Sequence, residues 1–249
     1  MSSRKKSLAP STRVTHSPAD APPSPWKRKG ERRTERELKR QAVLRAAAAL
    51  FKEKGFHATS LDEVAERLYV TKPTLYRYVK NKDEILFECV RLGIETLQAA
   101  VEAVGSSGGT ALEKLVAAIR QYVTIVTLDF GMCVIRVGED PLPPESRRKL
   151  RRLKRQIDHE FRGLIAQGVA EGSLAPCDPK MAAFVLGGAL SWVGRWYRPD
   201  GPLSADQIAE HCIMILLTGL SSPNAPRVTP ASARAMMARQ FSKTEGRNA

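Results

Sequence analysis

The sequence lacks the residue patterns on which catalytic and metal sites depend. Its four histidines (His16, His57, His159, His211) have no metal-ligand spacing, and no Ser/His/Asp arrangement or Gly-rich phosphate loop is found. The four cysteines have neither zinc-site nor redox-motif spacing, and a chain of 249 residues needs no disulfide to fold. We therefore expect a protein that is not an enzyme, with no cofactor, no metal and buried thiols in a reducing cytoplasm.

Long apolar segments and strand patterns are also missing. No run approaches the roughly 18 apolar residues of a membrane-spanning helix, and the basic N-terminus lacks the apolar segment of a signal peptide. No window sustains the period-two alternation of a half-buried strand. The sequence predicts a soluble, cytoplasmic, all-α protein with no membrane partner.

Acidic residues are in deficit, which bears on the partner. The chain has 40 Lys+Arg against 26 Asp+Glu, a formal charge of +14, and this excess favours a polyanion such as nucleic acid. Residues 1–40 hold 12 basic and 4 acidic side chains. Residues 1–34, rich in Ser, Pro and basic residues, are predicted to be a disordered basic tail, either simply solvated or contacting phosphates without sequence preference. Residues 221–249 form a second tail with one short predicted helix, at 231–240.

A helix-turn-helix domain is predicted over residues 35–81. Apolar residues at helical spacing fill the first helix, which should end at Gly55. Ser60, with a glutamate three residues later, opens the second helix with a capping box. Thr71 caps the third helix and puts Pro73 in its first turn, where a missing N–H costs no intrahelical bond. Two short capped helices after a longer one are typical of this motif.

The third helix should bury one face and expose the other. Leu75 and Val79, four residues apart, share the buried face. The outward arc carries hydroxyl, phenol and guanidinium groups suited to phosphates and base edges, on Pro73, Thr74, Tyr76 and Arg77.

Residues 40–86 resemble the DNA-binding domain of TetR/AcrR-family repressors, whose signature runs from LFxxxGFxxTS through VxxxTLYxYFxxKxxL. The matching positions are Leu50-Phe51, Gly55-Phe56, Thr59-Ser60, Val70, Thr74-Leu75-Tyr76, Tyr78-Val79, Lys82 and Leu86. Val79 departs from the commoner Phe, which affects packing alone. The resemblance implies a homodimer that binds a palindromic double-stranded DNA operator.

The same resemblance assigns the DNA contacts. Thr59 and Ser60 would contact phosphate, and Tyr78 and Lys82 would hold the backbone. The major groove would face Lys72, Pro73, Thr74 and Tyr76, while Arg77 adds charge.

Residues 82–220 are predicted to form a helical ligand-binding and dimerisation domain. A helix at 82–103 belongs to both domains and is the expected lever between them. By the resemblance, helices at about 179–198 and 204–220 form a four-helix bundle with a second copy. Both are apolar nearly all round, as a helix covered on every side must be.

Two segments bear on the effector. RWYRPDGPLS resembles a subgroup of the family that responds to acyl-CoA thioesters, although as a helix connection it needs no ligand. Trp192, Arg195 and Trp196 beside it would line a ligand tunnel or fill the dimer seam. ESRRKLRRLKRQ carries seven basic residues on an amphipathic helix. These form a solvated face, or they capture CoA phosphates through Arg147, Arg148, Arg151 or Arg152.

The sequence thus indicates a DNA-binding transcriptional regulator, a ligand-released homodimeric repressor of a catabolic or lipid-related operon with an acyl-CoA effector. The alternatives are a repressor of an efflux pump that responds to a hydrophobic drug-like ligand, and a basic helical adaptor that does not bind DNA. Repression and activation are not distinguished at this level.

Overall fold

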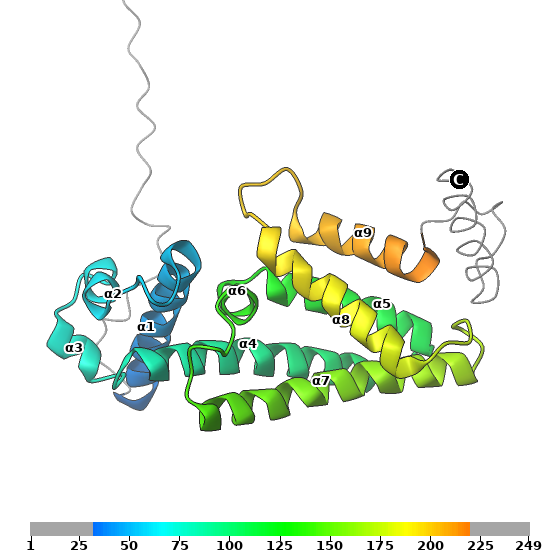
Figure 1. The fold of residues 1–249 in the computed structure, drawn as a ribbon, viewed down its shortest axis with the longest axis horizontal. Helices are drawn as coiled ribbons and strands as arrows, with labels where there is room; N and C mark the ends of the chain where they lie inside the picture. Colours follow the sequence, from blue (N-terminus) through cyan, green and yellow to red (C-terminus); the bar gives the residue numbers. More distant parts are fainter. Residues whose placement is uncertain (1–31, 220–249) are drawn as a thin grey trace, which may run out of the picture.

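The computed structural model describes residues 32–219, and every regular element in that range is an α-helix, as predicted (Figure 1). The helices are α1 (Arg32–Lys54), α2 (Leu61–Arg67), α3 (Lys72–Tyr76), α4 (Lys82–Gly105), α5 (Ala111–Val126), α6 (Asp129–Arg136), α7 (Pro144–Ala170), α8 (Pro179–Trp196) and α9 (Ala205–Thr218).

The first three helices form a small unit at one end of the molecule (Figure 1). α1 ends where predicted, at Gly55, whose φ of +86° is a left-handed conformation that glycine adopts without steric cost. It begins at Arg32, so residues 32–34, expected in the disordered tail, are helical. The rest of that tail and the short helix predicted at 231–240 lie outside the described residues.

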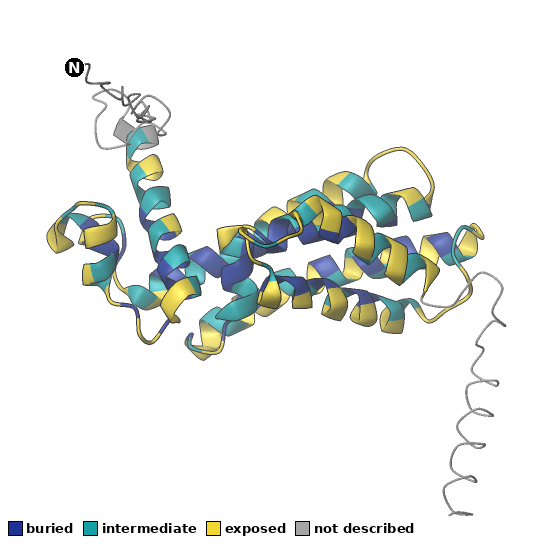
Figure 2. Ribbon diagram, turned by 90° about the horizontal axis from the view of Figure 1, so that it is seen from above, coloured by how far each residue is buried: buried dark blue, intermediate teal, exposed yellow. Residues whose placement is uncertain are grey.

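The remaining helices pack into two layers along α4. α4 runs from the small unit into the larger one beside α7, and α5, α8 and α9 lie across them (Figure 1). Buried residues line the inner faces of these helices, whereas α8 and α9 keep much of their outer surface exposed (Figure 2). α4 is therefore the element shared by the two units, as expected.

α6 is a helix that the sequence did not predict, and it lies against α1, α4, α5 and α8. It approaches α4 closely at Gly93, where a Cβ atom would come 2.7 Å from Val134 Cγ2 and 2.8 Å from the Phe130 carbonyl oxygen. A Cβ on Gly131 would lie 1.9 Å from the Ile125 carbonyl oxygen. Two glycines thus allow α6 to pack with almost no free space.

Among the described residues no single helix has both the length and the apolar composition needed to cross a membrane. α5 and α6 meet that requirement only when taken as a pair, and they are bent by 85° to one another.

Candidate DNA-binding surface and ligand cavity

The recognition helix α3 is oriented as the sequence predicted. Leu75 and Val79 are buried in the core of the small unit, and Tyr76 and Arg77 are exposed. Thr71 occupies the N-cap position, but its hydroxyl makes no capping bond and instead lies 2.9 Å from the Thr74 hydroxyl. The phenol of Tyr76 and the guanidinium of Arg77 are therefore exposed, while buried aliphatic side chains hold this segment against the core.

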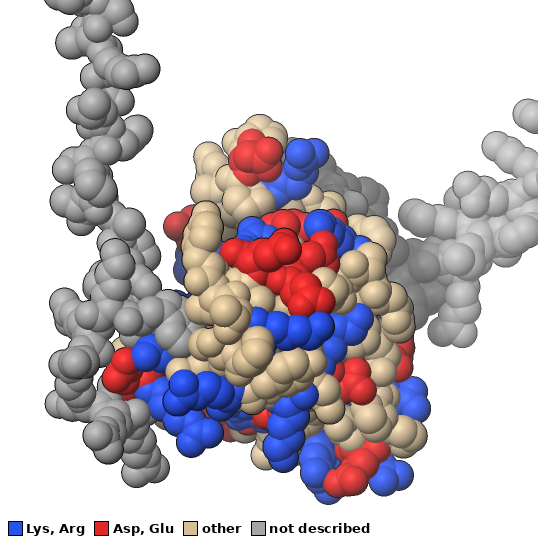
Figure 3. Space-filling model, turned by 90° about the vertical axis from the view of Figure 1, so that its left-hand side faces the viewer, with Lys and Arg blue, Asp and Glu red and all other residues tan. Residues whose placement is uncertain are grey.

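Charge of both signs surrounds α3 (Figure 3). Lys72, Arg77 and Lys80 are exposed basic residues, but the Lys72 ammonium lies 2.9 Å from the Asp62 carboxylate of α2. This hydrogen bond, together with the charge of Asp62, raises the pKa of Lys72. The outward arc of α3 carries no acid of its own, yet a neighbouring helix supplies one, so a phosphate would have to replace Asp62 at Lys72.

Ser60 and Thr59, predicted as a pair, have different surroundings. Ser60 is exposed and forms the predicted capping box, its hydroxyl accepting from the Glu63 N–H at 3.1 Å. Hydrogen bonds from Lys54 and from the Ser60 N–H lower the pKa of Glu63 to about 2. Thr59 is only 1% exposed, and its hydroxyl donates to the Gly55 carbonyl at 2.8 Å. The Thr59 hydroxyl therefore stabilises the end of α1, and the phosphate contact assigned to this residue remains a prediction.

Lys82 has partners that the sequence did not predict. Its ammonium donates to the carbonyl oxygens of Phe56 at 2.8 Å and Thr59 at 3.0 Å, with His57 farther away at 3.4 Å. It also lies 4.5 Å from the centre of the Phe56 ring. Lys82 thus holds the start of α4 to the loop between α1 and α2, and its predicted contact with the DNA backbone remains a prediction.

A polar hollow beside α3 brings in residues that the sequence did not reveal. It is lined by Tyr76, Arg77, Tyr78 and Lys80 and, across from them, by Arg36 of α1. Tyr78 is half-buried and packs against the core. A helical stretch rich in charge gives no signal of which residues face α3, so only the fold could identify Arg36.

Tyr69 forms the turn between α2 and α3 in an unusual conformation. Its φ is +55°, in the left-handed region that costs a residue with a Cβ atom of order 1 kcal/mol. The side chain is 96% exposed, so packing within the small unit does not offset that cost. The sequence identified the turn but not its conformation.

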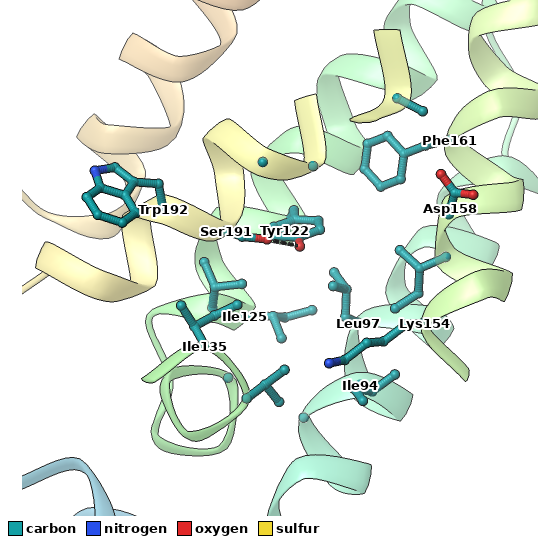
Figure 4. A pocket seen from close by; sticks show the side chains of 18 of the residues that line it. Ile94, Leu97, Tyr122, Ile125, Ile135, Lys154, Asp158, Phe161, Ser191 and Trp192 are labelled. Carbon is teal, nitrogen blue, oxygen red and sulfur yellow. Dashed lines mark hydrogen bonds between the residues drawn. The ribbon is translucent and has the colours of Figure 1, made fainter. Parts of the chain in front are cut away.

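A cavity of about 730 Å³ lies in the larger unit, bounded by α4, α5, α6, α7 and α8 (Figure 4). Its walls are mainly apolar and include Ile94, Leu97, Ile125 and Phe161. The volume suits a drug-sized or acyl-chain ligand.

One hydrogen-bonded pair places two hydroxyl groups in this otherwise apolar wall. The Tyr122 and Ser191 hydroxyl oxygens lie 2.7 Å apart, and the burial of the phenol raises the pKa of Tyr122 (Figure 4).

Basic side chains of α7 and α8 gather along one edge of the cavity. Arg151, Lys154, Arg155 and Arg195 all line it. Two of them are held by Glu139, which is 8% exposed. Its carboxylate accepts from Arg151 Nε at 2.7 Å and from Lys154 Nζ at 2.8 Å. Burial alone would raise the pKa of Glu139, but these hydrogen bonds outweigh it and the pKa lies below its ordinary value. We call Glu139, Arg151 and Lys154 the Glu139 clamp.

The predicted ligand residues divide into two groups. Arg151, Trp192 and Arg195 line the cavity. The other four are absent from its lining, namely Arg147, Arg148, Arg152 and Trp196. The part of α7 that lines the cavity begins at Arg151, so Arg147 and Arg148 lie too near the start of the helix to reach it.

Trp192 lies at the rim of the cavity. The indole is 65% exposed and points away from the other labelled side chains (Figure 4). The position fits an external contact better than a cavity wall.

The outer faces of α8 and α9 expose apolar side chains that a lone surface would not favour. The exposed residues are Met181, Phe184, Val185, Trp192, Trp196, Met214 and Ile215. Gly187 and Gly188, on α8, line the cavity, and a Cβ atom on either would meet nothing within 4 Å.

Metal-ligating groups do not converge anywhere in residues 32–219. Cys89 and Cys133 are buried, as predicted, and burial raises the pKa of the Cys89 thiol well above its ordinary value. Cys177 is exposed and Cys212 half-buried, which corrects the prediction of four buried thiols.

Two family descriptions match consecutive parts of the chain. Residues 43–89 match "Bacterial regulatory proteins, tetR family", and residues 108–220 match "Tetracyclin repressor-like, C-terminal domain". The chain is 27% identical over 192 residues to the HTH-type transcriptional repressor KstR2 of Mycolicibacterium smegmatis, covering 74% of this chain and 91% of that one.

Solved structures show the same likeness. The TetR family regulator PfmR from Thermus thermophilus is 31% identical with a TM-score of 0.67, over 72% of this chain and 99% of PfmR. AibR, solved in complex with isovaleryl coenzyme A and operator DNA, is 27% identical with a TM-score of 0.64, over 72% of this chain and 98% of AibR.

Proposed function

The chain belongs to the TetR family of transcriptional regulators, and we propose that it is a homodimeric repressor released from its operator by an acyl-CoA thioester. The observation that carries the proposal is the cavity, which combines an apolar interior with four basic side chains along one edge. An acyl chain needs the first feature, and the phosphates of coenzyme A need the second.

The DNA contacts follow from the exposed residues of the small unit. Pro73, Thr74 and Tyr76 face the major groove, where a proline methylene can contact a thymine methyl and a phenol or hydroxyl can bond a base edge. Ser60, Lys72, Arg77 and Tyr78 hold the phosphates, joined by Arg36 and Lys80 beside the polar hollow. Lys82 acts indirectly, by fixing the loop that carries Ser60.

A second copy of the chain covers the exposed apolar face of α8 and α9. The exposed side chains on this face include Met181, Val185 and Met214, and burying them against the same face of a second copy removes apolar surface from water. Trp192 and Trp196 contribute to this seam. Two recognition helices held one DNA turn apart read the two halves of a palindrome.

Release from DNA follows from linkage. An effector that prefers a dimer with the wrong spacing of recognition helices must weaken DNA binding by the same free energy that DNA imposes on effector binding. α4 carries the change, because it lines the cavity through Ile94 and Leu97 and begins beside the loop of the small unit. The usual coupling is roughly 1–3 kcal/mol, or 5–150-fold.

The test measures binding of the full chain to a labelled duplex from its own upstream region, at stated salt. Isovaleryl-, octanoyl- and palmitoyl-CoA are then added, with free coenzyme A and the free acids as controls. Release by at least one thioester but not by its separate parts supports the proposal. Binding of the duplex without release by any thioester would overturn the effector class. A duplex bound no more tightly than a scrambled one would overturn the operator.

A repressor of an efflux pump, with a hydrophobic drug-like effector, is the second candidate. The Tyr122–Ser191 pair favours it, since two hydroxyls in an apolar wall suit an uncharged polar group. This candidate leaves the basic edge without a role. Calorimetry distinguishes the two, because only an acyl-CoA would lose affinity when Arg195 is replaced by Gln.

A further inference from the structure

The Glu139 clamp is an internal ion pair placed where the proposed effector would carry its charge. Arg151 and Lys154 line the cavity, and both give hydrogen bonds to the carboxylate of one buried acid. That acid comes from the connection between α6 and α7 rather than from a cavity wall. The basic edge is therefore already neutralised in part by the chain itself.

We propose that Glu139 is an internal anion that an anionic group of the effector displaces from Arg151 and Lys154, freeing the connection between α6 and α7. The inference rests on the proposed ligand cavity and adds how that cavity distinguishes its ligands. The Glu139 carboxylate is buried, whereas the Arg151 and Lys154 side chains are 56% and 40% exposed, so a second anion can reach the cations while Glu139 is still bonded to them. An anionic ligand can replace Glu139, whereas an uncharged one that fills the same apolar space leaves it in place.

The position of Glu139 links this exchange to the DNA-binding unit. At its start, α6 is tied to α1 by the Asp129 carboxylate, 2.9 Å from the Lys52 ammonium. At its end, Arg136 donates to the carbonyl oxygens of Gly194 at 2.9 Å and Tyr197 at 2.8 Å. Glu139 follows three residues later and ties the same end to α7. Of these three connections, the Glu139 clamp is the one whose cations an anion in the cavity can reach.

The backbone around Glu139 is fixed on both sides. Gly138, with a φ of +72°, donates its N–H to the Cys133 carbonyl at 3.2 Å and so ends α6. Leu142 is buried and its N–H donates to the Glu139 carbonyl at 3.0 Å. The carboxylate can therefore leave Arg151 and Lys154 by rotation of its own side chain, which removes the tie between the connection and α7.

The experiment uses two dyes with the same aromatic frame, the anion 1-anilinonaphthalene-8-sulfonate and the uncharged N-phenyl-1-naphthylamine. Binding of each to the full chain is followed by fluorescence for wild type, Glu139→Gln and Glu145→Gln. Glu145 is the matched control, since it is an exposed glutamate paired with Lys149 and is absent from the cavity lining. We expect Glu139→Gln to bind the anionic dye about 10-fold more tightly and the uncharged dye as before. Glu145→Gln should change neither.

An unchanged ratio of the two affinities in Glu139→Gln would overturn the proposal, whether neither dye gains affinity or both gain equally. Dye bound to the exposed face of α8 and α9 does not confuse the result, because that face is the same in both variants. If Glu139→Gln fails to fold, Glu139→Asp keeps the charge but shortens its reach, and a smaller gain for the anionic dye alone is expected. The dyes require neither DNA nor coenzyme A, so failure of the acyl-CoA assay and failure here are separate outcomes.

Discussion

The ammonium group of Lys82 lies 2.8 Å from the carbonyl oxygen of Phe56, so the first residue of α4 is bonded to the loop that follows α1. Two further carbonyls of the same loop point at the same ammonium. These hydrogen bonds fix the start of α4 to the small unit.

Replacing Lys82 by Met should lower the free energy of unfolding by about 2 kcal/mol, because partly buried carbonyls lose a charged donor. Chemical denaturation of wild type and variant measures this difference in the free energy of unfolding. Lys80→Met is the control, since Lys80 is exposed in the connection between α3 and α4, and it should change stability by less than about 0.5 kcal/mol. Equal losses in the two variants would show that the hydrogen bonds of the Lys82 ammonium contribute nothing to the free energy of unfolding.

Tyr76→Ala should weaken specific operator binding by about 1–3 kcal/mol without lowering the thermal midpoint, because the ring is exposed. Arg77→Ala should weaken binding to all sequences alike and reduce the slope of log affinity against log salt by about 1. Fluorescence anisotropy at several salt concentrations separates the two. The assignment of base and phosphate contacts would be refuted if the effects were interchanged.

Tyr69→Gly should stabilise the protein by about 1 kcal/mol, since glycine adopts the positive φ of the turn without steric strain. Tyr69→Ala is the matched control, as it removes the same exposed ring but keeps a Cβ atom. Urea unfolding should show a gain for the glycine variant alone. A gain of equal size in both would trace the effect to the ring rather than to the backbone.

Val185→Glu should convert the proposed dimer to a monomer, because it puts a charge into the apolar face of α8. Light scattering after size exclusion gives the mass directly. Leu128→Glu is a suitable control, because Leu128 is also exposed but precedes α6. A dimer that persists in Val185→Glu would place the interface elsewhere.

Glu139 should make stability fall in acid. The pKa of its carboxyl is lower in the folded protein than in the unfolded chain, so its contribution is complete above the unfolded value near 4.5. It is lost as the pH falls through the lower, folded value. Denaturation midpoints of wild type and Glu139→Gln should therefore be separated by a constant amount at pH 6–8 and converge below about pH 4. Parallel curves down to pH 3 would contradict the lowered pKa.

Local signals predicted the small unit well. Caps and fixed spacings determined the ends of α1 and α2 and the buried face of α3, because these depend on neighbours within four residues. The surroundings of Thr59 could not be predicted in this way. Its hydroxyl could serve phosphate or the Gly55 carbonyl, and only the closed turn shows that the carbonyl takes it.

The larger unit was harder to predict because its contacts join distant residues. α6 is eight residues long, lacks a side-chain cap and follows α5 after a break of two residues, so no start signal marks it. The side of α7 that faces the cavity could have been predicted from the sequence. Arg151, Lys154, Arg155 and Asp158 recur at helical spacing beside the apolar stripe, and Arg152 lies outside their arc. Arg148 shares their spacing but lies one turn nearer the start of α7.

The two glycines at which α6 packs closely bear on how the protein would respond to an effector. Gly93 and Gly131 bring backbone so close that a Cβ atom could not be accommodated, which leaves α6 no room for small adjustments. Tightly packed elements of this kind exchange between discrete arrangements and do not deform continuously. A half-saturating effector would then produce a mixture of fully competent and fully incompetent molecules.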